Sequence, residues 1–179
     1  MSALKRRALR ELHRRLGIPA DYSARRHMPW TREASTLVSI GPAADDGKIV
    51  HLSPRAASAW KRMKAAGAAE TISLLPLSGF RSVARQAVII RSKLAAGESI
   101  ESILRLVAAP GCSEHHTGRA LDIGSPTNLK LEAGFARTRE YRWLKANAHR
   151  FGFHLSYPKN NQHGIGYEPW HWYWKSSST

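Results

Sequence analysis

The sequence predicts an α+β protein in which helices flank a small, mainly antiparallel sheet. Apolar residues recur at helical spacing in several long stretches of the chain. Short apolar runs lie between these stretches and are bounded by glycine, proline and aspartate, a pattern typical of strands. Because the helices precede or interrupt the short strands, the predicted class is α+β.

The composition is that of one globular domain. The chain has 179 residues, enough for a compact unit with its own core, and 42% of them are hydrophobic. No stretch approaches the roughly 20 apolar residues of a membrane-spanning helix, so we expect no membrane span. The single cysteine, Cys112, excludes an internal disulfide framework and a multi-cysteine zinc finger. We expect a monomer.

The N-terminal part is predicted to be an extension of the main domain. Residues 1–50 should form a basic helix and a connecting segment packed on residues 51–179. The helix spans residues 4–16 and ends at Gly17 and Pro19. One of its faces is apolar, and the opposite face carries Lys5, Arg6, Arg10, Arg14 and Arg15. A solvated basic face is the favoured interpretation, and a docking helix or an arm for an anionic surface is the alternative.

The first strands and the next helix follow this extension. Strands are expected near residues 36–40 and 48–52, with a turn rich in glycine, proline and aspartate between them. Ser53 is suited to cap a helix whose first residue is the following proline, and this helix should run to Gly67.

The middle of the chain alternates between a strand and two helices. A strand is predicted at 71–77, where Pro76 places its end at a sheet edge or a bulge. Ser82 can cap a second helix that ends at Gly97, and a third helix should span 99–109. The C-terminal part is predicted to hold a strand at 119–123, a helix at 138–150, and short strands near 153–157 and 170–174.

The charge of the chain indicates an anionic partner. It has 28 Lys and Arg against 13 Asp and Glu, a net charge of +15. Such a surface attracts nucleic acid, anionic lipid or an anionic cell-wall polymer. We expect no nucleic-acid partner, because no helix-turn-helix, zinc-finger or RNA-recognition signature is present. The N-terminus lacks the continuous apolar core of a signal peptide, so we expect a cytoplasmic protein or one that lysis releases to the cell wall.

Two short segments near the C-terminus carry the chemically informative side chains. A catalytic zinc site needs about three protein ligands and an open position for water, and two imidazoles with a carboxylate meet that need. His115 and Asp122 are seven residues apart, and an odd separation on one straight strand would place them on opposite faces. We therefore expect His115 in a turn bent by Gly118, and Asp122 on the strand that follows. His171 would come from a neighbouring strand.

Glu168 would then lie beside the metal in the loop before that strand. A carboxylate there can accept a proton from the attacking water and later give it to a leaving amine. Taken singly, a histidine or an acid of this kind is more often structural or solvated. The assignment therefore depends on the residues in combination.

Three ordered motifs in this region resemble a known family. Residues 113–122 match the pattern Ser-x-His-x-x-Gly-x-Ala-x-Asp, and Glu168 with His171 matches Glu-x-x-His. Upstream, Ser78-Gly79-Phe80-Arg81-Ser82 with Gln86 resembles the family's Ser-Gly-(Tyr/Phe)-Arg-Ser…Gln element. These segments are similar to the VanY-type D-alanyl-D-alanine carboxypeptidases, within the lysostaphin / D-Ala-D-Ala metallopeptidase group. The resemblance covers roughly residues 53–174.

The resemblance implies a role for each matching residue. It implies one zinc ion per chain, bound by His115, Asp122 and His171, with Glu168 as the general base. It also implies that Arg81 faces the substrate, where a guanidinium can pair with a C-terminal carboxylate or with the oxyanion of the intermediate. Two further residues could either contact the substrate or serve the structure alone: Gln86 and Ser113.

The function implied is that of a zinc metallopeptidase acting on peptidoglycan stem peptides. In that case residues 51–179 are the catalytic domain, and muropeptides and an anionic cell-wall polymer are the partners. A D-alanyl-D-alanine carboxypeptidase is the first choice, followed by an L,D-carboxypeptidase and a phage-type endolysin endopeptidase. The alternative of another class is a non-catalytic cell-wall-binding module.

Other polar and aromatic residues near these motifs are given lesser roles. His116 directly follows His115 and is expected to point elsewhere, and Cys112 is not expected to be a nucleophile. Trp170 could pack under the substrate. Three further histidines are assigned to structure or solvent: His149, His154 and His163.

Overall fold

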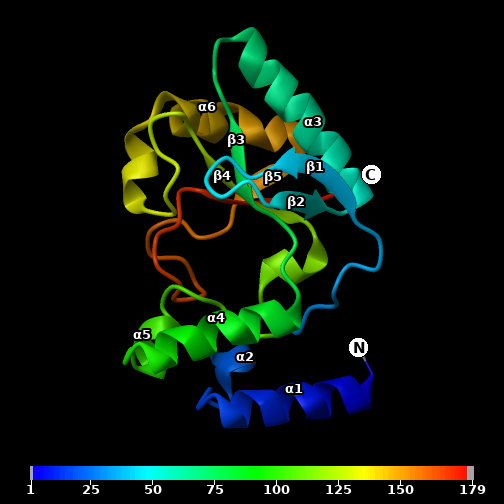
Figure 1. The fold of residues 1–179 in the computed structure, drawn as a ribbon, viewed down its shortest axis with the longest axis vertical. Coiled ribbons are helices and arrows are strands. Elements are labelled where there is room, and N and C mark those ends of the chain that lie inside the picture. The colour runs from blue at the N-terminus through cyan, green and yellow to red at the C-terminus, as the bar shows by residue number, and fades with distance from the viewer. Residues whose placement is uncertain (1, 177–179) are drawn as a thin grey trace.

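The computed structural model describes residues 2–176, and its elements form two layers (Figure 1). The upper layer in that view holds the strands and the helices packed on them. The lower layer consists of helices, with the N-terminal helix furthest from the sheet. The mixture of helices with small antiparallel sheets confirms the predicted α+β class.

The upper layer is built on a four-stranded antiparallel sheet with the order β3-β4-β6-β5. Its strands are β3 (Leu75–Ser78), β4 (Ala120–Gly124), β5 (Phe153–Leu155) and β6 (His171–Trp174). All five residues of β4 are buried, so this strand forms the centre of the sheet. The register pairs Asp122 with His171 across β4 and β6.

A hairpin and two helices complete the upper layer. The hairpin joins β1 (Val38–Pro42) to β2 (Ile49–Leu52), as predicted. The helices are α3 (Pro54–Ala69) and α6 (Arg139–Asn147), the latter preceded by the 3-10 turn η2 (Ala133–Arg137) and continued by η3 (Ala148–Phe151). Their apolar faces and the sheet enclose one core, which includes Leu52, Trp60, Met63, Leu121 and Phe153.

The lower layer has a separate core. It contains α1 (Ala3–Arg15), α2 (Tyr22–Arg25), α4 (Val83–Ala95) and α5 (Ile100–Ile103). Side chains from these helices and from two loops pack together, among them Leu16, Tyr22, Ile90, Ile103, Tyr157 and Ile165. The predicted N-cap of the second helix is present, because the Ser82 hydroxyl accepts from the backbone N–H of Arg85 at 3.0 Å. Among residues 2–176, no helix has the length and apolarity needed to cross a membrane.

Two predicted elements are shorter than expected. The helix predicted at 99–109 is wrong beyond Ile103, because the backbone that would continue it bonds elsewhere. The Ala108 carbonyl accepts from Gln86 Nε2 at 2.7 Å, and the Ala109 N–H donates to the Tyr22 hydroxyl at 3.3 Å. The strand predicted at 71–77 begins only at Leu75, since a turn closes helix α3 first.

Smaller differences concern strand ends and turns. The register of β3 shifts after Pro76, and β3 lies at the sheet edge, as the proline predicted. The strand predicted at 153–157 ends at Leu155. The short helix α2 and the 3-10 turn η2 were not predicted, and η1 (Glu114–Thr117) was predicted only as a turn, because segments of four or five residues carry too little periodicity. The division of the chain at residue 50 stays a prediction, and it falls inside the β1–β2 hairpin.

Candidate metal centre

The candidate site begins with a cross-strand pair in the four-stranded sheet. Asp122 lies in the middle of β4 and His171 is the first residue of β6. Because they are register partners, their side chains share one face of the sheet. His171 Nδ1 lies 3.1 Å from Asp122 Oδ1, and both side chains are buried.

His115 reaches this pair from the turn that precedes β4. It belongs to η1, which ends at Gly118 with a φ of 63°. A Cβ at Gly118 would also lie 2.9 Å from the Ser53 backbone nitrogen, so the turn requires glycine. His115 Nε2 lies 3.3 Å from Asp122 Oδ2. The turn-then-strand geometry predicted from the odd spacing is confirmed.

The three side chains form a buried group with the chemistry of a metal site. One ligand atom from each lies within 4.8 Å of the others, and residues 2–176 contain no other such group. Each imidazole keeps one nitrogen for the group while an acceptor holds the other. Gly79 O lies 2.6 Å from His115 Nδ1, and Glu114 Oε2 lies 2.9 Å from His171 Nε2. Zinc-binding histidines are held in this way, so the donor set fits zinc.

The electrostatics of the cluster favour a cation. Burial acts to raise the pKa of the Asp122 carboxyl, but His115 and His171 hold that pKa far below its usual range. Burial acts to lower the pKa of His171, and its hydrogen bonds to Asp122 and Glu114 outweigh burial and raise it to about 10. The carboxylates therefore create a negative field at the two imidazoles, and a divalent cation would be attracted by the same field.

Glu168 lies in the loop that leads into β6, as predicted. Its Oε2 atom is 3.8 Å from His171 Nδ1, and the Glu168 N–H donates to Tyr157 O at 3.1 Å. Burial raises the pKa of the Glu168 carboxyl to about 7. A carboxyl group that titrates near neutrality can both accept and release a proton, which is what a general base must do.

Arg81 approaches the cluster from the segment between β3 and α4. One of its amino groups lies 3.7 Å from Asp122 Oδ2, and the same nitrogen donates to the Ser78 hydroxyl at 3.1 Å. The other amino group donates to Gln86 Oε1 at 3.2 Å, while Gln86 Nε2 donates to Ala108 O. The guanidinium is therefore fixed in position from two sides.

One cavity of about 310 Å³ contains all of these predicted residues. Arg81, Gln86 and Ser113 line it together with the metal cluster and Glu168. Trp170 is part of its wall, together with Tyr157, Ile165, Leu106 and Leu131. The structure thus brings every predicted site residue into one pocket, while the substrate-binding roles of Arg81, Gln86 and Ser113 stay predictions.

Two residues of the η1 turn have contacts that the sequence did not reveal. Glu114 pairs with His171, although it falls at a variable position of the motif. His116 is fully buried and points away from the cluster, as expected. The Gly111 N–H donates to its Nε2 at 3.0 Å, so its Nδ1 carries the proton and donates to Arg81 O at 2.6 Å. Only the folded chain brings these partners together.

Cys112 is excluded as a nucleophile by its surroundings. It is buried in the lower core, and burial raises the pKa of its thiol to about 12. A catalytic cysteine needs a lowered pKa and a histidine base.

Comparison with known proteins gives consistent results. A family model described as "VanY: D-alanyl-D-alanine carboxypeptidase" matches residues 49–177. The YodJ protein of Bacillus subtilis (strain 168) is 39% identical over 125 residues, 68% of this chain and 45% of that protein. VanXYC of Enterococcus gallinarum, a bifunctional D-Ala-D-Ala dipeptidase and D-Ala-D-Ala carboxypeptidase, is 32% identical over 132 residues, 68% of this chain and 66% of that protein. The chain thus spans about half to two thirds of the length of these two relatives.

Solved structures show the same likeness. The LdcB LD-carboxypeptidase superposes with a TM-score of 0.72 at 36% identity, covering 82% of this chain and 71% of that one. A VanY D,D-pentapeptidase variant from a VanB-type resistance cassette, solved with Zn(II), gives a TM-score of 0.63 at 26% identity and covers 82% of each chain. With a family model that matches most of its length, and with the motif residues gathered in one pocket, the chain belongs to the VanY D-alanyl-D-alanine carboxypeptidase family.

Proposed function

We propose that this protein is a zinc-dependent carboxypeptidase that removes the terminal D-alanine from peptidoglycan stem peptides ending in D-Ala-D-Ala. One observation supports this above all others. A buried His-Asp-His cluster, an acid whose pKa is raised toward neutrality and a fixed guanidinium share a single pocket. These are the parts that hydrolysis of a peptide bond next to a carboxylate requires.

Each residue would have a distinct task in this reaction. His115, Asp122 and His171 would hold the zinc ion, which polarises the scissile carbonyl and acidifies its bound water. Glu168 would accept the proton of the attacking water and deliver it to the amine that leaves. Arg81 would bind the substrate's terminal carboxylate or the oxyanion, and Gln86 with Ser78 would keep its guanidinium from turning away.

The bond that is cut can be assigned from products. The related structures are compatible with two specificities, since one is an LD-carboxypeptidase and another is VanYB in complex with D-Ala-D-Ala. The purified protein should be incubated with a pentapeptide ending in D-Ala-D-Ala, with the tetrapeptide and with a cross-linked dimer, each with zinc or with a chelator. Loss of one alanine from the pentapeptide is expected. Cleavage of only the tetrapeptide or only the dimer would assign L,D-carboxypeptidase or endopeptidase activity instead.

A non-catalytic cell-wall-binding module would behave differently in the same assay. It would bind muropeptides without changing their mass, with or without zinc. The presence of all three candidate ligands together with Glu168 favours the enzyme, because a degenerate site is expected to lose at least one of them. No hydrolysis of any of the three substrates in the presence of zinc would contradict the proposal.

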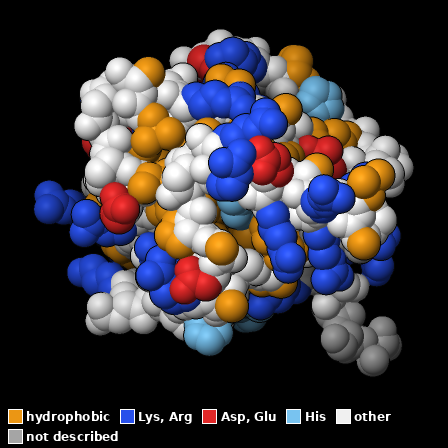
Figure 2. All heavy atoms as spheres, turned by 90° about the horizontal axis from the view of Figure 1, so that it is seen from below, with side chains coloured by type: hydrophobic (Ala, Val, Ile, Leu, Met, Phe, Trp, Pro, Cys, Tyr) orange, Lys and Arg blue, Asp and Glu red, His pale blue; other side chains and the backbone are white. Residues whose placement is uncertain are grey.

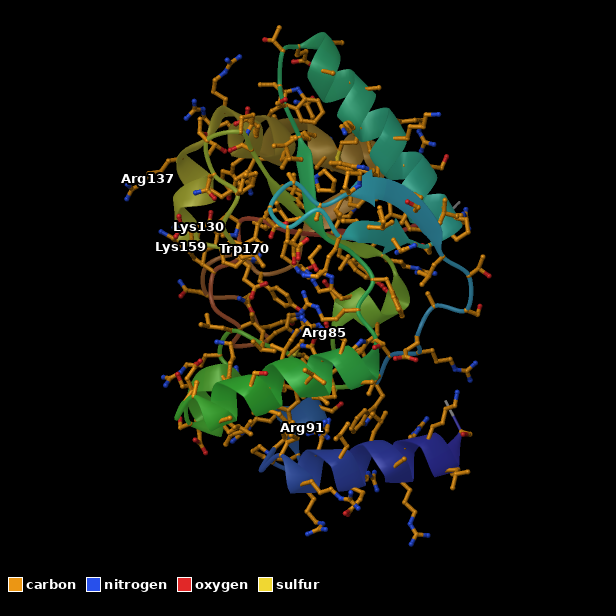
Figure 3. All side chains as sticks on the ribbon, in the orientation of Figure 1. Arg85, Arg91, Lys130, Arg137, Lys159 and Trp170 are labelled. Atoms are coloured by element: carbon orange, nitrogen blue, oxygen red, sulfur yellow. The ribbon has the colours of Figure 1, made fainter. Side chains whose placement is uncertain are left out.

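The basic surface supports an anionic cell-wall polymer as a second partner. Figure 2 views the molecule from the side of α1, where Lys and Arg side chains spread over the face and outnumber the Asp and Glu side chains among them. In Figure 3, Lys130 and Lys159 lie on the same side of the molecule as Trp170, a residue of the pocket wall. We propose that long-range attraction concentrates the protein on the polymer that carries its substrate. Sedimentation with purified cell wall should decline steeply as salt is raised.

A further inference from the structure

The candidate ligand His171 has a charged partner on the side away from the pocket. Its Nε2 lies 2.9 Å from Glu114 Oε2, while its Nδ1 faces Asp122. The Ser156 hydroxyl donates to the same Glu114 oxygen at 2.6 Å. A chain Ser156–Glu114–His171 therefore leads from the loop after β5 to the metal cluster.

The two histidines of the cluster differ in how they are held. His115 donates from Nδ1 to a neutral backbone carbonyl, that of Gly79. His171 faces a carboxylate instead, and this carboxylate belongs to the residue directly before His115. The η1 turn thus supplies one ligand and fixes another that is 56 positions further along the chain.

We propose that Glu114 is a positioning residue that presents His171 to the metal, with Ser156 keeping Glu114 in place. The inference rests on the proposed function, because it concerns the zinc that this function requires. When a metal takes the place of the Nδ1 proton, a carboxylate at Nε2 would hold the remaining proton there and leave the Nδ1 lone pair for the metal. Without it, the one proton of the neutral ring would be free to stay on Nδ1 and bond to Asp122 Oδ1, which lies 3.1 Å away. In that alternative, His171 and Asp122 would be hydrogen-bonded to each other, and neither atom of the bond would be available to the metal.

The location of the three residues supports a positioning role. Ser156 directly follows β5, which pairs with β6, so the register that places His171 also places Ser156. The His171 ring packs at 4.8 Å from the Tyr157 ring, measured between centroids, which limits the ring's rotation. Glu114 keeps about a quarter of its side chain exposed, so removing it does not open a large cavity.

The test is the zinc affinity of the purified full-length protein, measured by competition with a chromophoric chelator. We expect Glu114→Ala to weaken zinc binding by about 10- to 100-fold, the usual effect of losing such a partner. Glu114→Gln should weaken it less, since an amide oxygen can still accept from Nε2, and Ser156→Ala should have the smallest effect. Glu101→Ala, an exposed acid on α5, is the matched control and should leave the affinity unchanged.

Spectra of the Co²⁺-substituted protein provide a second readout, because a change in the ligand set alters the visible bands. Zinc affinity and cobalt spectrum both equal to those of Glu101→Ala would overturn the inference. If the Glu114 variants gave that result and the unmodified protein still hydrolysed its peptide in a zinc-dependent way, the proposed function would stand without the positioning role of Glu114. An unmodified protein that binds no zinc would overturn both.

Discussion

The part of the chain that matches the family and the part that precedes it contribute to the site in opposite ways. Residues 49–177 supply all the side chains that line the pocket. The N-terminal segment, defined here as residues 2–37, supplies none of them. It contacts instead the loop that carries His115, which we call the metal loop and define as residues 110–118.

The N-terminal segment holds the metal loop at several points. His13 Nε2 donates to Pro110 O at 2.7 Å, and the Thr31 N–H donates to Gly111 O at 2.7 Å. The Ala34 N–H donates to His116 O at 2.8 Å. The Arg26 guanidinium also donates to the carbonyls of His163 and Gly164, the residues directly before Ile165 of the pocket wall. The candidate site residues therefore lie in the part that matches the family model. The loops near them are held in place by the N-terminal segment, which that model does not cover.

The largest expected effect comes from the region with the chemistry. Glu168→Gln should lower kcat by about 100- to 10,000-fold, because the proposed general base is lost. Its zinc content and thermal unfolding should match those of the unmodified protein. Peptide release measured by mass spectrometry gives the rate, with Glu70→Gln as an exposed control. A rate within a few-fold of the unmodified protein would show that Glu168 is not the base.

The N-terminal segment should contribute through packing. Tyr22 is 1% exposed and its ring fills the lower core. Tyr22→Ala should lower the free energy of unfolding by about 3 kcal/mol or more, as large-to-small core changes do. Tyr22→Phe keeps the ring and loses only the hydroxyl, which accepts from Ala109 N–H and donates to Met28 Sδ, so it should cost about 1 kcal/mol. Urea unfolding measures the loss of unfolding free energy in both variants. Equal losses would show that packing of the Tyr22 ring does not stabilise the fold.

A smaller effect is expected where the segment touches the metal loop through a hydroxyl. Thr31 Oγ1 donates toward Gly111 O at 3.2 Å and Ser113 O at 3.3 Å. Thr31→Val keeps the shape and removes this donor, which should cost about 1 kcal/mol of unfolding free energy. Thr36→Val changes an exposed threonine in the same segment and should cost nothing. A loss no larger than that of Thr36→Val would contradict a holding role for the hydroxyl.

The smallest effect concerns pH. Burial lowers the pKa of His13 below its usual 6.5, although its bond to Pro110 O opposes the shift. Below pH 6.5 the unfolded chain therefore binds a proton that the folded chain does not, and stability falls as the pH is lowered through that range. His13→Gln keeps a donor for Pro110 O and does not titrate. Between pH 8 and pH 5, urea unfolding should show a larger loss of unfolding free energy for the unmodified protein than for His13→Gln. Equal losses would show that His13 does not cause this pH dependence.

The sequence predicted the elements whose signals are local. Caps and periodicity located α1, α3 and α4, and the odd spacing of His115 and Asp122 predicted a turn followed by a strand. The contacts of the N-terminal segment could not be predicted in this way, because they join residues such as His13 and Pro110 that are 97 positions apart. The same holds for Glu114, whose role depends on where β6 places His171, and for α5, which ends early because its backbone bonds to Gln86 and Tyr22.

The pairing of Asp122 with His171 has a consequence for stability as well as for chemistry. The two residues are 49 positions apart and belong to neighbouring strands, so an ion bound to both would act as a reversible cross-link across the sheet. Unfolding would have to release that ion. A concentration of free zinc about 1,000 times its Kd would then add about 4 kcal/mol to the free energy of unfolding. On this basis, metal supply would set the fraction of the chain that is folded together with its activity.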